Sequence, residues 1–158
     1  MIRKKLLTTV LTLVFMACGA AHAAMPGVTI QSLQGSFDDV KERLVTAIEN
    51  RGLVLNYTAR IGAMLERTGK DIGNSRQVYA NAETLEFCSA GVSRSTMEAD
   101  PRNIVFCPYA IAIYVLPNEP GTVYLAYRKP LVGGSVRSMK ALREVGRLLD
   151  TIVADTLK

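Results

Sequence analysis

The chain has 158 residues, a length that favours one domain over several. Hydrophobic residues make up 49% of it and charged residues 21%, and a chain of this size can bury a core without needing disulfides to hold it together. The formal net charge is +5, but three of the basic residues lie within the first five positions. The charge therefore does not indicate a nucleic-acid-binding surface.

The N-terminal segment has the three parts of a secretory signal peptide. Basic residues at positions 3–5 precede an apolar run over residues 6–17, and Ala21-His22-Ala23 forms an A-x-A cleavage site. The apolar run is shorter than the ~20 residues that a membrane-spanning helix needs. We predict a signal peptide over residues 1–23, cleavage after Ala23, a periplasmic location and a single α+β domain over residues 24–158.

Two alternatives remain for this segment: a buried N-terminal helix, and an outer-membrane lipoprotein anchored through Cys18. The lipoprotein is disfavoured because Phe15 stands where such sites usually carry a small aliphatic residue. Removal of residues 1–23 would also remove His22, the only histidine, in a chain that has no tryptophan. The mature protein would then lack histidine-dependent triads and histidine-ligated metal sites.

The first half of the chain predicts two helices and three strands. Ser36 can cap a helix, Asp38 and Asp39 suit its positive end, and apolar residues recur on one face as far as Ile48. These two carboxylates are explained by the helix start and indicate no acid–base pair. In the following strand we expect Leu53, Leu55, Tyr57, Ala59 and Ile61 to share one face. The expected strands cover residues 28–34, 53–61 and 84–88, and the expected helices cover residues 36–51 and 62–68.

The second half predicts a central strand, a hairpin and a long helix. Residues 104–116 are apolar on both faces, which favours a strand covered on both sides, bent near Pro108. A turn over residues 117–121 leads to a partner strand over 122–128. Ser135 caps a C-terminal helix over residues 136–157, and one or two helical turns are expected over 93–99.

This element order predicts an α+β fold. A single, mostly antiparallel sheet of about five strands is expected to pack against a long N-terminal helix and a long C-terminal helix.

The segment Gly35 to Asp39, followed by Leu44 and Gly52, resembles the opening of the bacterial domain-of-unknown-function 302 family. The segments around Cys88 and Cys107 are similar to its two cysteine motifs, although Pro108 follows the second cysteine where the family usually has asparagine. The resemblance covers about residues 30–130. It implies a sheet with a long helix against it, similar to the TATA-binding-protein arrangement, and it implies no DNA binding and no known activity.

The two cysteines that remain after export allow four interpretations. An even number in an oxidising compartment indicates a structural disulfide between Cys88 and Cys107. They would otherwise be a reversible redox pair, two inert buried thiols, or ligands of a soft metal or haem. The redox interpretation requires a cation or helix N-terminus beside one thiol, and Arg94 and Arg102 are close in sequence.

Two further groups of residues are candidate binding sites. Tyr57, Met64 and Tyr109 would line a ligand pocket between sheet and helix, with ordinary sheet packing as the alternative. A glycine pair before a helix with a nearby cation would hold an anion, with an ordinary loop and cap as the alternative. That second group comprises Gly133, Gly134, Ser135 and Arg137.

The function that these patterns favour is a non-enzymatic periplasmic domain that binds a small ligand or a protein partner. The alternatives are a thiol/disulfide redox accessory protein and a lipid-anchored envelope protein. No catalytic residue, metal, cofactor or nucleic-acid partner is indicated, no transmembrane helix is expected in the mature protein, and a homo-oligomer is left open.

Overall fold

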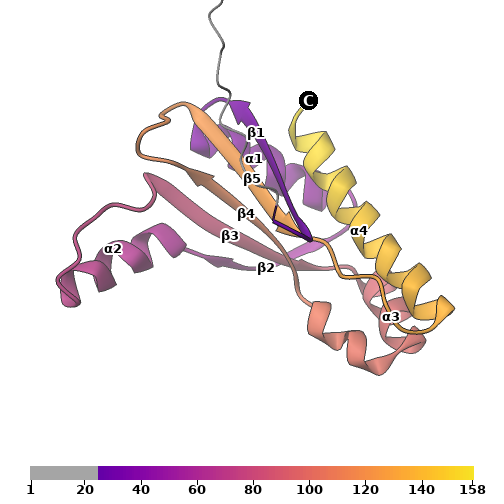
Figure 1. The fold of residues 1–158 in the computed structure, drawn as a ribbon. Helices are drawn as coiled ribbons and strands as arrows, with labels where there is room; N and C mark the ends of the chain where they lie inside the picture. The colour runs from indigo at the N-terminus through magenta and orange to yellow at the C-terminus, as the bar shows by residue number, and fades with distance from the viewer. Residues whose placement is uncertain (1–24) are drawn as a thin grey trace, which may run out of the picture.

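The computed structural model describes residues 25–158, and its centre is a five-stranded antiparallel sheet in the order β1-β5-β4-β3-β2 (Figure 1). The predicted signal peptide lies outside the described residues. The fold is α+β, which confirms the predicted class. The strands are β1 (Val28–Gln34), β2 (Val54–Ala59), β3 (Asn81–Cys88), β4 (Tyr109–Val115) and β5 (Thr122–Arg128). The helices are α1 (Phe37–Glu49), α2 (Ile61–Asp71), α3 (Ala90–Ala99), the 3-10 helix η1 (Pro101–Phe106) and α4 (Val136–Thr156).

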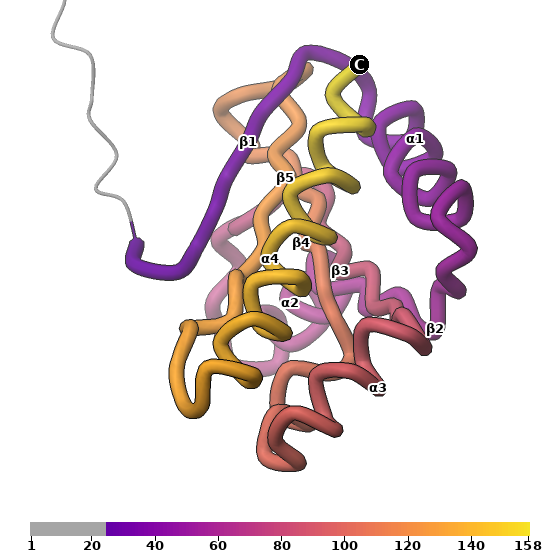
Figure 2. The backbone as a smooth tube through the Cα atoms, turned by 90° about the vertical axis from the view of Figure 1, so that its right-hand side faces the viewer, coloured from indigo at the N-terminus to yellow at the C-terminus, as the bar shows by residue number. Residues whose placement is uncertain are grey.

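Helices α1 and α4 pack side by side on one face of the sheet (Figures 1 and 2). Ser36 and Ser135 cap them as predicted, each hydroxyl accepting a hydrogen bond from the backbone N–H three residues on. Their apolar faces meet alternate residues of the three central strands, which point to the same side. The largest fully buried side chains of this core are Phe87, Leu44, Ile48, Leu85, Ile111, Ile113, Leu125, Leu149 and Ile152.

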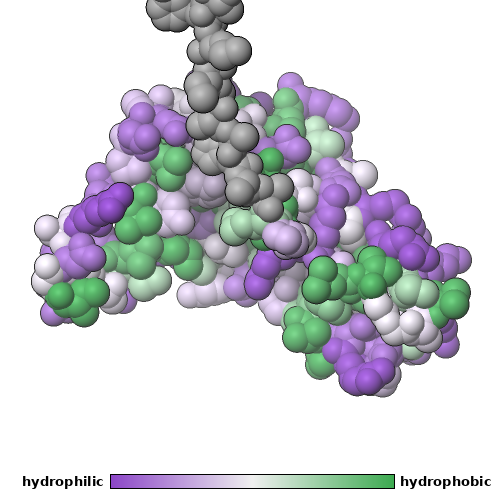
Figure 3. Space-filling model, in the orientation of Figure 1, coloured by the Kyte–Doolittle hydropathy of each residue, from purple (hydrophilic) through white to green (hydrophobic). Residues whose placement is uncertain are grey.

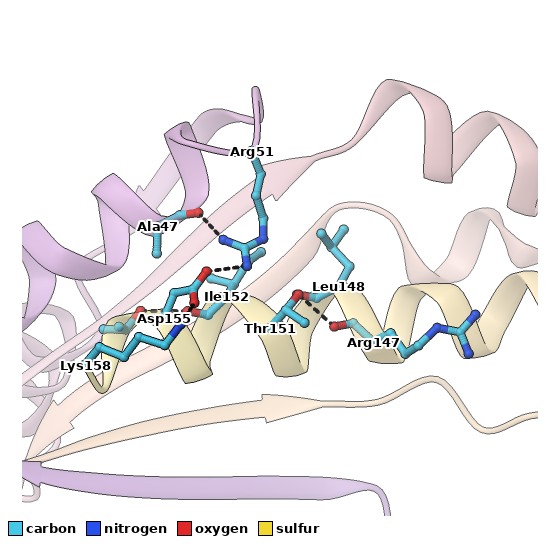
Figure 4. Close-up of polar contacts among 9 residues, drawn as sticks. Ala47, Arg51, Arg147, Leu148, Thr151, Ile152, Asp155 and Lys158 are labelled. Atoms are coloured by element: carbon cyan, nitrogen blue, oxygen red, sulfur yellow. Dashed lines mark hydrogen bonds and ion pairs between the residues drawn. The ribbon is translucent and has the colours of Figure 1, made fainter.

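Arg51 links the C-terminal end of α1 to the C-terminal end of α4 through hydrogen bonds (Figure 4). Its guanidinium donates to the carbonyl oxygen of Ala47 at 3.0 Å and to Asp155 Oδ2 at 2.5 Å. Lys158 donates to the other oxygen of Asp155 at 2.7 Å. The hydrogen bonds from Lys158 and Arg51 lower the pKa of the Asp155 carboxyl.

The structure corrects the strand that was predicted over residues 104–116. Residues 101–106 form η1, and β4 begins only at Tyr109. Asp100 caps η1 by accepting a hydrogen bond from the backbone N–H of Arg102 at 3.0 Å, and Pro101 occupies its first turn. An apolar run without periodicity does not distinguish a strand from a short helix, whereas this cap and proline do.

Strand β4 is central, as predicted, but only one of its faces is covered by helices. The other face of the sheet carries small residues at its centre, Ala110, Ala112 and Ala126, which are half-buried. Tyr114 stacks on Tyr124 beside them, with ring centroids 5.1 Å apart. We call this side of the sheet the open face. The prediction that both faces of the strand must be covered was wrong because alanine exposes little apolar area.

Strand β2 also differs from its predicted alternation. A bulge at Asn56 shifts the register, so that Leu55 lies opposite Phe87 but Tyr57 lies opposite Glu86. An extra residue in one strand moves every following side chain to the other face. Leu55 and Tyr57 therefore point to opposite sides, and Tyr57 is exposed on an edge strand.

Helix α2 projects from the body of the molecule, away from α1 and α4 (Figure 1). It has no buried residue, and its first turn approaches β3 closely. A Cβ atom at Gly62 would lie 3.0 Å from the backbone nitrogen of Ala82, so a larger residue there would require α2 and β3 to move slightly apart. Within residues 25–158, no helix combines the length and apolar character that crossing a bilayer would require.

Candidate functional site

The two cysteines meet at the end of the sheet where β3 stops and β4 starts. Cys88 is the last residue of β3, and Cys107 follows η1 immediately. Their sulfur atoms are 3.4 Å apart and both side chains are partly exposed. The separation exceeds the ~2.05 Å of a covalent S–S bond, so both residues are thiols in this structure. The predicted proximity is present, whereas the predicted disulfide is not formed.

Polar side chains from two further elements contact this dithiol, and a third element, β4, contributes Tyr109 behind them. Asn56, in the bulge of β2, donates from Nδ2 to Cys88 Sγ at 3.2 Å. Ser93, in the first turn of α3, places its hydroxyl oxygen 3.7 Å from Cys107 Sγ. The same hydroxyl donates to the Tyr109 hydroxyl at 3.2 Å. A continuous row of polar contacts thus runs from Asn56 through both sulfurs to Tyr109.

The local sequence explains why these elements converge. Ser89 follows Cys88 and caps α3 by accepting a hydrogen bond from the backbone N–H of Val92 at 3.4 Å, so the chain turns directly from strand to helix. Buried Asn103 then fixes η1, donating to the carbonyl oxygen of Thr96 at 3.0 Å and to Ser138 Oγ at 2.9 Å. The chain returns through Cys107 and a cis peptide bond to Pro108.

Burial and neighbouring groups shift the pKa values of two titratable side chains of the site, Cys88 and Tyr109. Partial burial raises the pKa of the Cys88 thiol, and the adjacent Cys107 sulfur raises it further. Burial also raises the pKa of the Tyr109 hydroxyl. The raised pKa lowers the thiolate fraction of Cys88 at neutral pH, so its nucleophilicity increases as the pH rises.

The two arginines that are close in sequence pair with acidic residues instead of the sulfurs. Arg94 donates to Glu98 at 2.7 Å, one helical turn away. Arg102 binds Asp100 through two hydrogen bonds of 3.0 and 2.7 Å, and these bonds lower the pKa of the Asp100 carboxyl to about 2. Among residues 25–158, the side chains that form polar contacts with the two sulfurs from other positions are Asn56 and Ser93, so the dithiol lies beside the first turn of α3 and not beside a cation.

The structure does not bring Tyr57, Met64 and Tyr109 together. Tyr57 lies exposed on the edge strand, and Met64 lies on the projecting helix α2. Tyr109 is buried, 3% exposed, against Phe87 on the helix-covered side of the sheet. Tyr109 belongs instead to the surroundings of the dithiol.

The predicted anion site has the geometry of an ordinary helix cap. Ser135 Oγ accepts a hydrogen bond from the backbone N–H of Ser138 at 3.1 Å, and Gly134 adopts a positive φ of 84° in the preceding turn. Gly133 and Arg137 are exposed. Among residues 25–158, no group of three or more His, Cys, Asp or Glu side chains is placed to hold a metal ion.

The sequence patterns did not identify Asn56 and Ser93 as residues of the site. Asn56 interrupts an otherwise alternating strand, a weak signal of a bulge. Ser93 follows the capping Ser89 by four residues, which places both near the start of one helix. Neither pattern indicates contact with a cysteine, because the partners are distant in sequence.

Comparison with known proteins identifies both the family and the fold. The family model described as "Domain of unknown function DUF302" matches residues 28–156, which include α4 and thus extend beyond the predicted resemblance. Among solved structures, the chain is similar to an uncharacterized conserved DUF302 protein from Bacillus stearothermophilus, with a TM-score of 0.69 and 16% identity. The match covers 85% of this chain and 100% of that one, and at this identity it supports the fold alone. The comparison with curated proteins found no match.

Proposed function

The chain belongs to the DUF302 family, and from the geometry of its dithiol we propose that it carries out thiol–disulfide exchange, with Cys88 and Cys107 as a reversible pair. The observation that carries the proposal is the 3.4 Å separation of two partly exposed sulfurs. Only a small movement separates this contact from the length of an S–S bond. Side chains on two flanking elements, Asn56 and Ser93, contact the sulfurs and orient them.

The exchange proceeds in two displacement steps with a disulfide of a partner protein or small molecule. The thiolate of Cys107 attacks one sulfur of the partner disulfide, forms a mixed disulfide and expels the other sulfur as a thiolate. The thiolate of Cys88 then attacks Cys107 Sγ and expels the second partner sulfur. The partner disulfide gains two electrons, the pair loses two electrons and two protons, and a Cys88–Cys107 disulfide forms.

The position and the pKa of Cys88 support its role in the second step. Burial raises the pKa of Cys88, which slows its attack on a partner in solution, but its sulfur already lies 3.4 Å from Cys107 Sγ, the atom attacked in the second step. Cys107 is partly exposed and lies beside exposed Pro108, so a partner can reach it. Ser93 can turn its hydroxyl to donate to Cys107 Sγ when that sulfur loses its proton.

A trapping experiment tests the proposal. The reduced protein is mixed with glutathione disulfide, alkylated, and analysed by mass spectrometry. The unaltered chain should form the internal disulfide, Cys88→Ser should accumulate a glutathione adduct on Cys107, and Cys107→Ser should react far more slowly. Ser95→Ala, on the exposed side of the same helix, is the matched control and should behave like the unaltered chain.

The reduction potential separates exchange from a permanent disulfide. Titration in glutathione buffers should give a potential more oxidising than about −300 mV, the region of labile disulfides. A potential below that value would overturn the proposal in favour of a structural disulfide. Failure of the pair to close at all would leave inert thiols as the explanation.

We also propose that the protein is exported. The support is the order of basic, apolar and small residues in positions 1–23. An oxidising compartment such as the periplasm would supply partner disulfides for the exchange.

A cleft beside α2 favours binding of a small ligand as a second candidate function. It has a volume of about 420 Å³ and lies between α2, the segment 72–80 and β3. Arg60 and Arg76 line it together with Tyr79. Native mass spectrometry of freshly isolated protein should show a co-purified ligand, and Arg76→Gln should reduce its amount. If neither the unaltered protein nor the Arg76→Gln protein carries a ligand, this second candidate function is excluded.

A further inference from the structure

One end of the molecule exposes a group of aliphatic side chains, which we call the end patch: Ile104, Val105, Leu131, Val132 and Val136. Val105, Leu131 and Val136 are 76%, 77% and 77% exposed, and Ile104 is 61% exposed. Folded proteins seldom gather so many exposed aliphatic residues without a binding role. Figure 3 shows the corresponding hydrophobic surface on the lobe at lower right, where Figure 1 places α3 and the start of α4.

The residues of the end patch come from two segments that meet at this end of the molecule. Asn103 in η1 donates to Ser138 Oγ in the first turn of α4, which holds the two segments together. Val105 and Leu131 line the same cleft of about 370 Å³, which also reaches Pro108 and Arg128. Val105 and Leu131 therefore share one surface, Ile104 and Val132 are their neighbours in the chain, and Val136 lies two residues before the buried Ser138.

Positive charge is concentrated around the end patch. Residues 94–108 and 128–140, together with Asp150, which pairs with Lys129, carry six Lys or Arg and three acidic residues, a formal net charge of +3. The rest of the described chain carries ten basic and eleven acidic residues, a net charge of −1. Within residues 25–158, no acidic side chain forms an ion pair with Arg128, Arg137 or Lys140, all of which are exposed.

We propose that the end patch docks on an anionic lipid surface. Exposed aliphatic residues that reach the acyl region, flanked by cations that meet anionic head groups, are the two components of peripheral membrane binding. The charge argues against a second copy of this chain as the occupant, because two such ends would repel each other. The dithiol adjoins this surface through η1 and Pro108, so docking would place it near the membrane.

A single tryptophan tests the proposal, because the chain has none of its own. Val105→Trp places a fluorescent side chain in the end patch, and Ile72→Trp places one at a similarly exposed position, 77%, on the α2 side. The full chain is mixed with vesicles containing phosphatidylglycerol and, separately, with vesicles of phosphatidylcholine alone. We expect the emission of the Val105→Trp protein to shift to shorter wavelength with the anionic vesicles, and that of the Ile72→Trp control to stay unchanged. The comparison is repeated with protein that begins at Ala24, because Pro26 and Gly27 line the same cleft as Val105 and Leu131, and an attached apolar leader would bring the end patch to a membrane by itself.

Further substitutions separate the apolar contribution to vesicle binding from the electrostatic contribution. In the Val105→Trp protein, Leu131→Asn should weaken binding to the anionic vesicles about tenfold. Arg128→Gln with Arg137→Gln should weaken it by a similar or larger factor, and high salt should have the same effect.

Three results would overturn the proposal. They are equal shifts at positions 105 and 72, no shift at 105 with anionic vesicles, or a shift at 105 that follows protein concentration without lipid. The last would identify a second copy of the chain as the occupant.

Discussion

At the scale of single residues, the proposed exchange depends on the different surroundings of Cys88 and Cys107, which the sequence alone does not distinguish. Cys88 ends a strand and is held in a partly buried position by Asn56, whereas Cys107 leaves a 3-10 helix next to an exposed proline. Burial disfavours the charged form of a thiol, so it suppresses attack by Cys88 at neutral pH.

The pH dependence of ring closure follows from that shift. The pKa of Cys88 is raised above its ordinary value, so at neutral and mildly alkaline pH its thiolate fraction increases with each rise in pH. The second displacement, measured by quenched alkylation of a preformed Cys107–glutathione adduct, should accelerate by about tenfold per pH unit. A rate independent of pH in this range would mean that Cys88 is not the attacking group in the second step.

Leu44 tests the assignment of the main core. It is fully buried between α1 and the sheet, so Leu44→Ala should lower the free energy of unfolding by about 2–5 kcal/mol in urea denaturation. Val54→Ala on the exposed edge strand is the control and should change it by less than about 0.5 kcal/mol. A similar decrease in the free energy of unfolding for both variants would contradict the described core.

At the scale of elements, the Asn103 side chain joins η1 and α3 to the start of α4 through hydrogen bonds. Its side-chain amide bridges Thr96 and Ser138 in a buried position, and both acceptors lie on other elements. The sequence contains no sign of this role, because an Asn after Pro-Arg suggests only a turn. The bridge supports both the dithiol and the end patch.

Removal of this bridge should destabilise the protein. Asn103→Ala leaves the Thr96 carbonyl and the Ser138 hydroxyl without their shared donor, and we expect a loss of about 1–3 kcal/mol in urea denaturation. Ring closure of the dithiol should slow as well, because η1 no longer holds Cys107 in place. Asn118→Ala in the exposed β4–β5 turn is the control, and an equal effect there would exclude the bridging role.

At the scale of the whole molecule, one sheet face is covered by two long helices and the other is nearly bare. This asymmetry leaves α2 and the lobe formed by α3 and η1 as two separate projections (Figures 1 and 3). The dithiol and the end patch both belong to the second projection. Exchange and docking are thus proposed at one end of the molecule and not across the sheet.

Export is a property of the whole chain and has a direct test. N-terminal sequencing of protein isolated from the periplasm should begin at Ala24, because cleavage is predicted after Ala23. A lipid-modified start at Cys18, or cytoplasmic protein that still begins at Met1, would contradict the prediction.

The sequence by itself determined the elements whose signals are local. Helix caps at Ser36 and Ser135, apolar residues at helical spacing and the turn before β5 depend on neighbours a few positions away, and these elements form where predicted. Their order was sufficient to predict the α+β class.

The tertiary structure decided everything that depends on strand register and on contacts between distant segments. The bulge at Asn56 reverses Tyr57, and the cap at Asp100 replaces the start of a strand by η1. These two features position Asn56 against Cys88 and Cys107 against Ser93, and they leave the aliphatic side chains of η1 exposed. Such outcomes follow from competition between alternative pairings of the whole sheet, which no local pattern in the chain records.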